Sequence, residues 1–225
     1  MRTTFEEQLN NLHLRFSEMG MMASEAIMKS VKAYIDHDKA LAKEVIKNDH
    51  VINKREMDLE KESFEMIALQ QPVTSDLRMI VTVLKASSDL ERMGDHAVSI
   101  AQETIRVKGE VRIPEIEQLI AEMGDMGTSI VEDSLEAYLK KDSKMAEEVA
   151  HRDIKIDAKS SMINELCIKD MQKTAENVLS GTSYMLVASY LERVGDYATN
   201  ICEWVVYLNT GHVVELNRKH MADED

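Results

Sequence analysis

Two pairs of carboxylates recur in this chain with a spacing of four residues. Glu91 and Asp95 form one pair, and Glu192 and Asp196 form the other. On a helix this spacing puts both side chains on one face, with their Cβ atoms roughly 5–6 Å apart. Like charges so placed repel each other, so the pair disfavours a helix and suits the chelation of a hard cation. The alternative is a solvated face whose charge neighbouring arginines and lysines neutralise.

A glycine lies inside each carboxylate pair, at Gly94 and at Gly195. Glycine in a helix interior costs about 1 kcal/mol relative to alanine. That cost occurs twice at equivalent positions, which predicts the close approach of a neighbouring helix or ligand at both pairs. The recurrence of the pair together with its glycine favours two cation sites over a purely structural acidic face.

A second set of oxygen-bearing side chains shows the same four-residue spacing. Antiparallel packing of consecutive helices would bring this set opposite the carboxylate pairs. All-oxygen ligation suits magnesium, manganese, calcium or iron better than structural zinc, and zinc stays among the candidates. The predicted clusters are Asp49, Asn53, Glu91 and Asp95, then Asp153, Asp157, Glu192 and Asp196, with Glu56 an extra candidate in the first and Asn200 in the second.

Helices must position these side chains, because apolar residues recur at helical spacing along most of the chain. Only 8 glycines and 2 prolines occur, too few for an all-β protein, which needs turn residues about every 8–12 positions. The 16 methionines suit the seams between helices, since the flexible thioether fills gaps. We therefore predict an all-α fold. Its clearest apolar stripe comprises Val83, Ala86, Leu90, Met93, Ala97 and Ile100.

Short polar segments mark the connections between these helices. Asp38 and Asp142 each follow such a segment and are predicted to be N-caps. Pro72 is predicted to end one helix, and Thr74–Asp76 to cap the next. The segment that joins the two halves of the chain ends at Pro114, which is well placed in a first helical turn.

The chain repeats itself, which predicts two related domains. A shift of 104 residues aligns Glu18–Gly20 with Glu122–Gly124, and further on a shift of 101 aligns Leu90–Asp95 with Leu191–Asp196. Each half is therefore predicted to be a bundle of three long antiparallel helices. The predicted boundaries are 1–109 for the first bundle, 110–216 for the second and 217–225 for a polar tail.

Composition excludes several other classes of protein. The 27 basic and 41 acidic residues give a net charge of −14, and aromatic residues make up 4%; neither suits a nucleic-acid binder. Cys167 and Cys202 are far apart in the sequence, so a disulfide framework is not expected and a reducing cytoplasm fits. No segment reads as a signal peptide or approaches the ~20 apolar residues of a membrane span.

Three segments resemble the motifs of the PhoU family of phosphate-uptake regulators. Leu90–Ala101 and Leu191–Ile201 are similar to its paired E-x-x-x-D signatures, and Gln71–Arg78 is similar to the segment that precedes its first motif helix. With the duplication and the length, the resemblance covers residues 1–215. It implies two similar three-helix bundles side by side.

The resemblance also implies a function, which is regulation rather than catalysis. It implies metal clusters, often of iron or zinc, at the residues of the two predicted clusters. It further implies a cytoplasmic protein at the inner face of the membrane, which restrains a phosphate ABC transporter through the ATPase component and helps to silence a sensor histidine kinase. Two departures, Ser99 in place of the asparagine found at Asn200 and Asn53 in place of a charge found at Asp157, predict weaker or fewer metals in the first cluster.

Two other functions stay open on the sequence alone. A di-metal carboxylate oxidase would use two E-x-x-H motifs in a helical bundle; Glu148–His151 is one, but its counterpart Glu44–Lys47 has no histidine. A metal-free helical adaptor would bind a basic partner through its acidic surface. Whichever function holds, a homodimer is the expected oligomer, since closed twofold homo-oligomers are the commonest.

Overall fold

The computed structural model describes residues 2–107 and 109–216, with the backbone alone for residues 2–4. The described residues form helices and short connections, and none of these helices is long and apolar enough to cross a membrane. The predicted tail, 217–225, lies outside the described residues. The elements are α1 (Arg2–Ile35), α2 (Lys39–Gln70), α3 (Thr74–Arg106), α4 (Pro114–Lys140), α5 (Ser143–Ala150), α6 (Asp153–Met171), the 3-10 turn η1 (Ala175–Asn177) and α7 (Val178–Thr210).

Most of the predicted helix boundaries are confirmed. The Asp38 carboxylate accepts hydrogen bonds from the backbone N–H groups that open α2, and Asp142 does the same at α5. Pro114 lies in the first turn of α4. The predicted cap of the helix after Pro72 is wrong, because Val73 occupies the N-cap position of α3 and makes no side-chain hydrogen bond there.

The prediction of three long helices in each half holds for the first half and needs correction in the second. The second helix of that half is divided into α5 and α6 at His151–Arg152, whereas α2 is continuous at the equivalent place. Neither glycine nor proline marks the break. The Arg152 guanidinium there binds α4, by an ion pair with Asp133 and a 2.8 Å hydrogen bond to the Ser129 hydroxyl.

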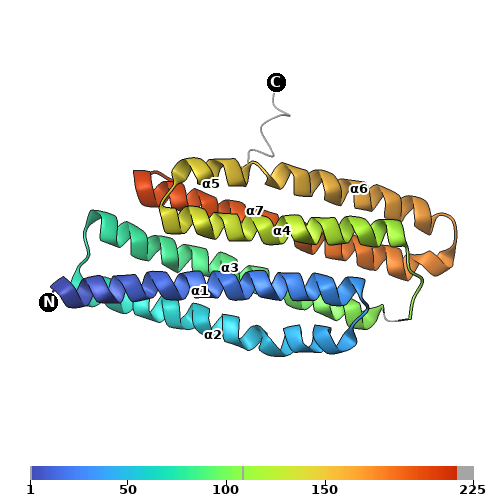
Figure 1. Ribbon diagram of the computed structural model, residues 1–225, viewed down its shortest axis with the longest axis horizontal. Coiled ribbons are helices and arrows are strands. Elements are labelled where there is room, and N and C mark those ends of the chain that lie inside the picture. Colours follow the sequence, from blue (N-terminus) through green and yellow to red (C-terminus); the bar gives the residue numbers. More distant parts are fainter. Residues whose placement is uncertain (1, 108, 217–225) are drawn as a thin grey trace, which may run out of the picture.

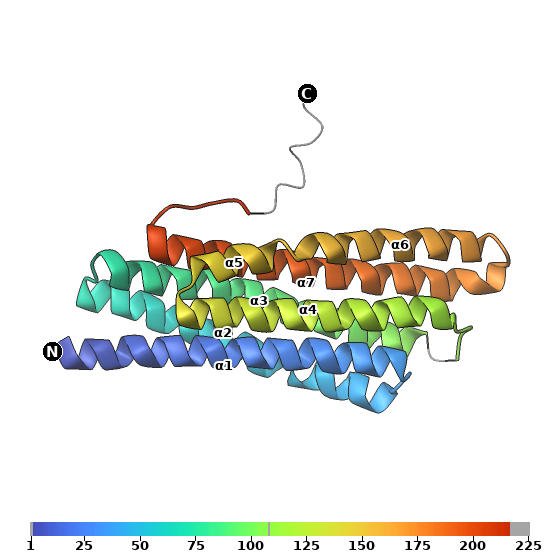
Figure 2. The same ribbon diagram turned by 45° about the horizontal axis from the view of Figure 1, so that its top comes forward.

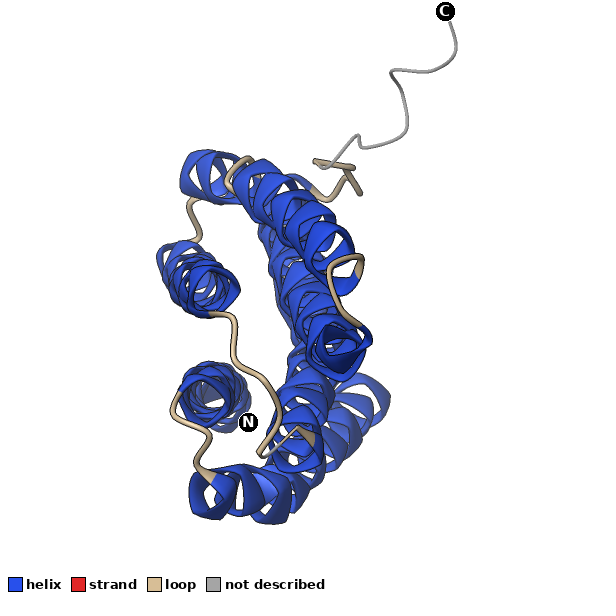
Figure 3. Cartoon of the chain, turned by 90° about the vertical axis from the view of Figure 1, so that its right-hand side faces the viewer, coloured by secondary structure: helices blue, strands red, loops and turns tan. Residues whose placement is uncertain are grey.

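The two bundles pack side by side, with α1 against α4 and α3 against α7 (Figure 1). Both pairs are antiparallel. The α5–α6 segment runs along the top edge in the tilted view of Figure 2. Seen end-on, α1 and α4 form one side of the molecule and α3 and α7 the other, while α2 and the α5–α6 segment lie at opposite edges (Figure 3). The predicted stripe of α3 faces the core along its whole length, since all six of its residues are fully buried.

Two glycines set how closely α1 and α4 approach. A Cβ at Gly124 would lie 2.6 Å from Val31 of α1, and a Cβ at Gly20 would collide with Leu135 of α4. The repeat relates Gly20 to Gly124 and Val31 to Leu135, so one contact is made twice. The duplication therefore shapes the interface between the bundles as well as each bundle.

Candidate metal centre

The residues predicted for the first cluster lie where the first half of α2 packs against the second half of α3. Asp49 lies against the motif glycine, because a Cβ at Gly94 would sit 3.4 Å from Asp49 Oδ1 and 3.3 Å from Ile52 Cδ1. Asn53 lies one turn further along α2, and its amide donates a 3.0 Å hydrogen bond to Asp49 Oδ2. The close approach that the glycine predicts is therefore confirmed, and a helix makes it.

The carboxylates of the first cluster affect one another's pKa values. Burial raises the pKa of Glu91, and the charge of Asp95 raises it further while Arg92 lowers it. Burial also raises the pKa of Asp49; the hydrogen bond from Asn53 opposes this, and Asp95 adds to it. Asp95 thus acts on acids of both helices. The cluster holds negative charge that is only partly compensated.

Arg92 supplies that partial compensation from the solvent side. Its guanidinium lies 3.4 Å from Asp95 and 3.8 Å from Glu91, and its side chain is 59% exposed. An exposed pair of this kind is worth at most about 1 kcal/mol. On the solvent-facing side, Arg92 thus neutralises part of the charge of Glu91 and Asp95, as expected for a solvated acidic face. On the side that faces α2, Asp49 and Asn53 lie next to the pair.

The second cluster repeats this arrangement on α6 and α7. Asp153 is fully buried and lies against the other motif glycine, so closely that a Cβ at Gly195 would collide with its carboxylate oxygen. Asp157 follows one turn later on α6, and Glu192 and Asp196 flank Gly195 on α7, all three of them half-buried. The close approach predicted at Gly195 is confirmed too.

The two extra candidates have different settings. Asn200 donates a 3.1 Å hydrogen bond to Asp89 of α3, across the contact between the bundles, instead of turning to the second cluster. Glu56 is near enough to the first cluster for its charge to raise the pKa of Glu91. It also lines a groove between α2, α3 and α7 that no motif or spacing in the sequence indicates.

One residue beside the first motif has an unexpected setting. The His96 ring is stacked between Tyr190 and Tyr197 of α7, with centroid distances of 5.6 and 5.7 Å. Burial lowers the pKa of His96, with Arg193 adding to the effect. The repeat aligns His96 with Tyr197. Alignment of two residues between repeats does not predict that their side chains are in contact, so this contact could not be expected from the sequence.

The side chains of the first cluster fit a hard cation in type. All are oxygen donors, and Asp49 Oδ1 and Asn53 Oδ1 are buried with no hydrogen-bond donor among the described residues. A cation would supply the partner that these oxygens lack. Across residues 2–107 and 109–216, no three or more histidine, cysteine, aspartate or glutamate side chains converge as a metal site requires, so metal binding stays a proposal.

Comparison with known proteins finds one family throughout. The model of the PhoU domain matches residues 16–104 and 120–205, one segment in each predicted repeat. The chain is 38% identical over 217 residues to a phosphate-specific transport system accessory protein PhoU homolog from Clostridium acetobutylicum, covering 96% of this chain and 99% of that protein. A homolog of the same name from Streptococcus pneumoniae serotype 4 is 36% identical, with 96% and 100% covered.

Solved structures agree with the sequence matches. The crystal structure of the phosphate transport system regulatory protein PhoU from Streptococcus pneumoniae is similar to the chain with a TM-score of 0.87 and 32% identity, over 94% of this chain and 99% of that one. The crystal structure of PhoU from Pseudomonas aeruginosa is similar with a TM-score of 0.88 and 29% identity, over 92% of this chain and 100% of that one. The predicted all-α fold of two related bundles is therefore confirmed.

Proposed function

This chain belongs to the PhoU family, and from that premise we propose that it is a metal-binding regulator of phosphate uptake and of phosphate-starvation signalling. The observation that carries the proposal is the pair of equivalent carboxylate clusters in a chain matched over both repeats. The relatives' printed names, which refer to phosphate-specific transport, supply the process.

In this proposal each cluster holds cations between two helices of one bundle. Asp49 and Asn53 on α2 and Glu91 and Asp95 on α3 hold the first set. Iron or zinc, with magnesium or manganese as further candidates, would offset the repulsion within each carboxylate pair and tie the two helices together. Asp153, Asp157, Glu192 and Asp196 would do the same between α6 and α7.

The proposed partners are the ATPase component of a phosphate ABC transporter and a sensor histidine kinase. The chain would act on them in the cytoplasm, at the inner face of the membrane and as a homodimer. No catalytic residue is proposed. The oxidase alternative gains nothing from the fold, because Glu148 and His151 are both exposed on the α5 segment rather than directed into the bundle.

Metal content tests the site. Protein purified without chelators should carry iron, zinc or manganese by elemental analysis, and Glu91→Ala with Asp95→Ala should remove the share bound by the first cluster. The variant should stay folded by circular dichroism, because the substitutions also relieve like-charge repulsion. A matched variant, Glu115→Ala with Glu147→Ala, removes two exposed acids outside both clusters and should keep its metal. Wild-type protein without metal, and without a thermal shift on adding these ions, would contradict the site.

The regulatory role is tested in the source cell. Deletion of the gene should leave a reporter of phosphate starvation switched on even in high phosphate, and the wild-type gene should restore repression. The Glu91→Ala, Asp95→Ala gene separates the first metal site from regulation, since restored repression by this variant would show that regulation does not need the first cluster. A reporter that stays repressed after deletion would refute the regulatory role.

A further inference from the structure

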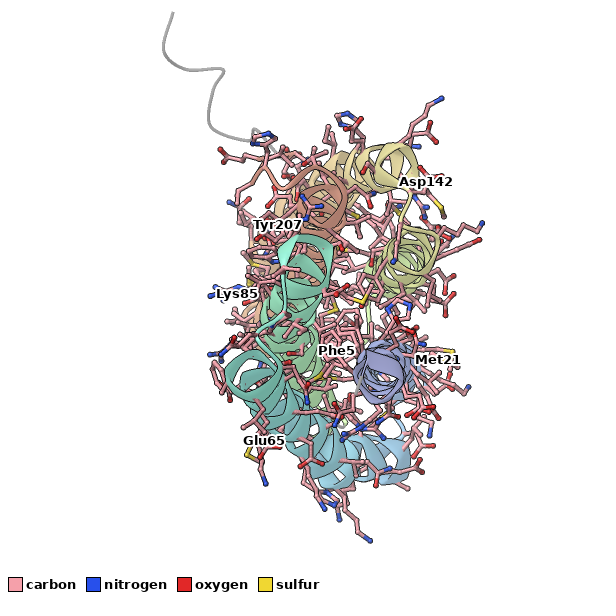
Figure 4. All side chains as sticks on the ribbon, turned by 90° about the vertical axis from the view of Figure 1, so that its left-hand side faces the viewer. Phe5, Met21, Glu65, Lys85, Asp142 and Tyr207 are labelled. Atoms are coloured by element: carbon pink, nitrogen blue, oxygen red, sulfur yellow. The ribbon has the colours of Figure 1, made fainter. Side chains whose placement is uncertain are left out.

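A groove of about 550 Å³ opens where α2, α3 and the C-terminal half of α7 meet. It lies away from the contact between α1 and α4. Figure 4 shows two of its lining residues, Lys85 of α3 and Tyr207 of α7, on one edge of the molecule, with Met21 of α1 on the opposite edge. The groove spans both repeats, since α2 and α3 belong to the first and α7 to the second.

Four carboxylates line this groove, those of Glu56, Glu60, Asp89 and Glu203, against the single ammonium of Lys85. Within the part of the chain that the structure describes, none of the four forms an ion pair with a lysine or arginine. Among the described residues, the hydrogen-bond donor to Asp89 is the neutral amide of Asn200, and the donor to Glu203 is the backbone N–H of Leu216, at 2.8 Å. The groove therefore carries uncompensated negative charge.

Aromatic and apolar side chains lie among these acids. Phe64 is 52% exposed, and Trp204 and Tyr207 line the wall from α7 in an edge-to-face pair with centroids 5.6 Å apart. The faces of such rings attract cations, and the attraction grows where water is excluded. Carboxylates beside aromatic faces suit the guanidinium of arginine and the ammonium of lysine, whose apolar stems would pack on the rings.

We propose that this groove binds a basic segment of a partner protein, with arginine or lysine side chains between the carboxylates and the aromatic rings. Charge selects this occupant. A second copy of the chain would bring another net charge of −14 towards the same acids. An anionic lipid surface or a nucleic acid would be repelled by them. The inference needs neither bound metal nor a role in phosphate uptake, so it can be tested independently of the proposed function.

The chain contains its own probe for this site, because Trp204 is the single tryptophan. A short peptide of alternating arginine and alanine, which has no aromatic residue, should change the emission of Trp204 and saturate at one peptide per chain. A matched peptide of alternating glutamate and alanine should have no effect. Binding of the basic peptide by calorimetry without any change in Trp204 emission would place it outside the groove and overturn the proposal.

Two charge-matched variants separate the groove from total charge. Glu60→Gln with Glu203→Gln should weaken binding by about tenfold or more, because both changes remove carboxylates that face the peptide. Asp125→Asn with Glu148→Gln makes the same change in net charge at exposed positions outside the groove and should leave affinity within about twofold. Circular dichroism checks that both variants are folded. Equal losses in the two would overturn the proposal.

The chain's own basic residues give a further control. Arg218 and Lys219 follow Leu216, whose backbone binds Glu203 at the rim. Binding by the wild-type full chain supports a partner segment as the occupant. Binding that arises only after Arg218→Ala with Lys219→Ala would make the occupant the chain's own C-terminal residues, and the partner-segment proposal would be wrong.

Discussion

At the scale of single residues, the motif glycines explain how the chain gathers like charges between two helices. The missing side chains at Gly94 and Gly195 let Asp49 and Asp153 lie against the backbone of α3 and α7. Each carboxylate pair thus gains a further acid on its inner side. The two sites are not identical, because Asp153 is fully buried and Asp49 is half-buried.

This difference predicts unequal costs for the same substitution. Gly195→Ala should destabilise the protein by about 1–3 kcal/mol, as overpacking in a dense interior does, since its Cβ meets both Asp153 and, at 3.1 Å, Ile156. Gly94→Ala should cost less, because the nearest atom is 3.3 Å away and alanine favours the helix by about 1 kcal/mol. Urea unfolding of the metal-free variants measures both. Equal changes in the free energy of unfolding would contradict this account.

At the scale of elements, the repeated glycine contact fixes the spacing of α1 and α4. Gly124→Ala should destabilise the protein by about 1–3 kcal/mol, because its Cβ would lie 2.6 Å from the branched, stiff side chain of Val31. Gly127, one turn later, is a matched control, since a Cβ there meets only Val194 at 3.7 Å. Gly127→Ala should be neutral or stabilise by up to about 1 kcal/mol. Thermal unfolding measures both, and a stabilising Gly124→Ala would refute the close contact.

Elements marked by local chemistry could be predicted from the sequence. Asp38 and Asp142 cap their helices because a carboxylate after a short connection reaches the free N–H groups of the next turn. The division at His151–Arg152 could not be predicted, since the bonds of Arg152 to α4 are tertiary and no breaker residue is present. The order of side chains along one helix likewise does not say which neighbouring helix they meet.

The site shows the same limit. The two four-residue spacings and antiparallel packing predict that the residues of α2 lie opposite the carboxylate pair of α3, and the structure places Asp49 against Gly94. The bond between Asn200 and Asp89 joins different repeats. Spacing within α7 places Asn200 on the same face as Asp196, but it does not reveal that α3 supplies a competing partner. The groove between α2, α3 and α7 was missed for the same reason.

At the scale of the whole molecule, one buried carboxylate joins the two repeats. Glu117, in the first turn of α4, receives hydrogen bonds from Arg112 in the connection, from His37 after α1 and from the Tyr184 hydroxyl of α7, at 2.6, 3.1 and 3.0 Å. Arg112 also donates to the carbonyl of Ile35 at 2.7 Å. Burial raises the pKa of Glu117, but the hydrogen bonds of Arg112, His37 and Tyr184 outweigh it, and the pKa lies below its ordinary value.

Glu117→Gln should therefore destabilise the chain by about 1–3 kcal/mol at neutral pH, the usual worth of hydrogen bonds to a charged group. A carboxyl with a lowered folded pKa stabilises the fold above its unfolded pKa, and that stability is lost as pH falls through the folded value. The difference in the free energy of unfolding between wild type and Glu117→Gln should thus shrink as the pH falls. Glu115→Gln is the matched control, since Glu115 is exposed in the same helical turn and shares any interaction with the helix dipole. Urea unfolding across pH measures the difference; one that is independent of pH, or equal in Glu115→Gln, would show that the network does not join the repeats through charge.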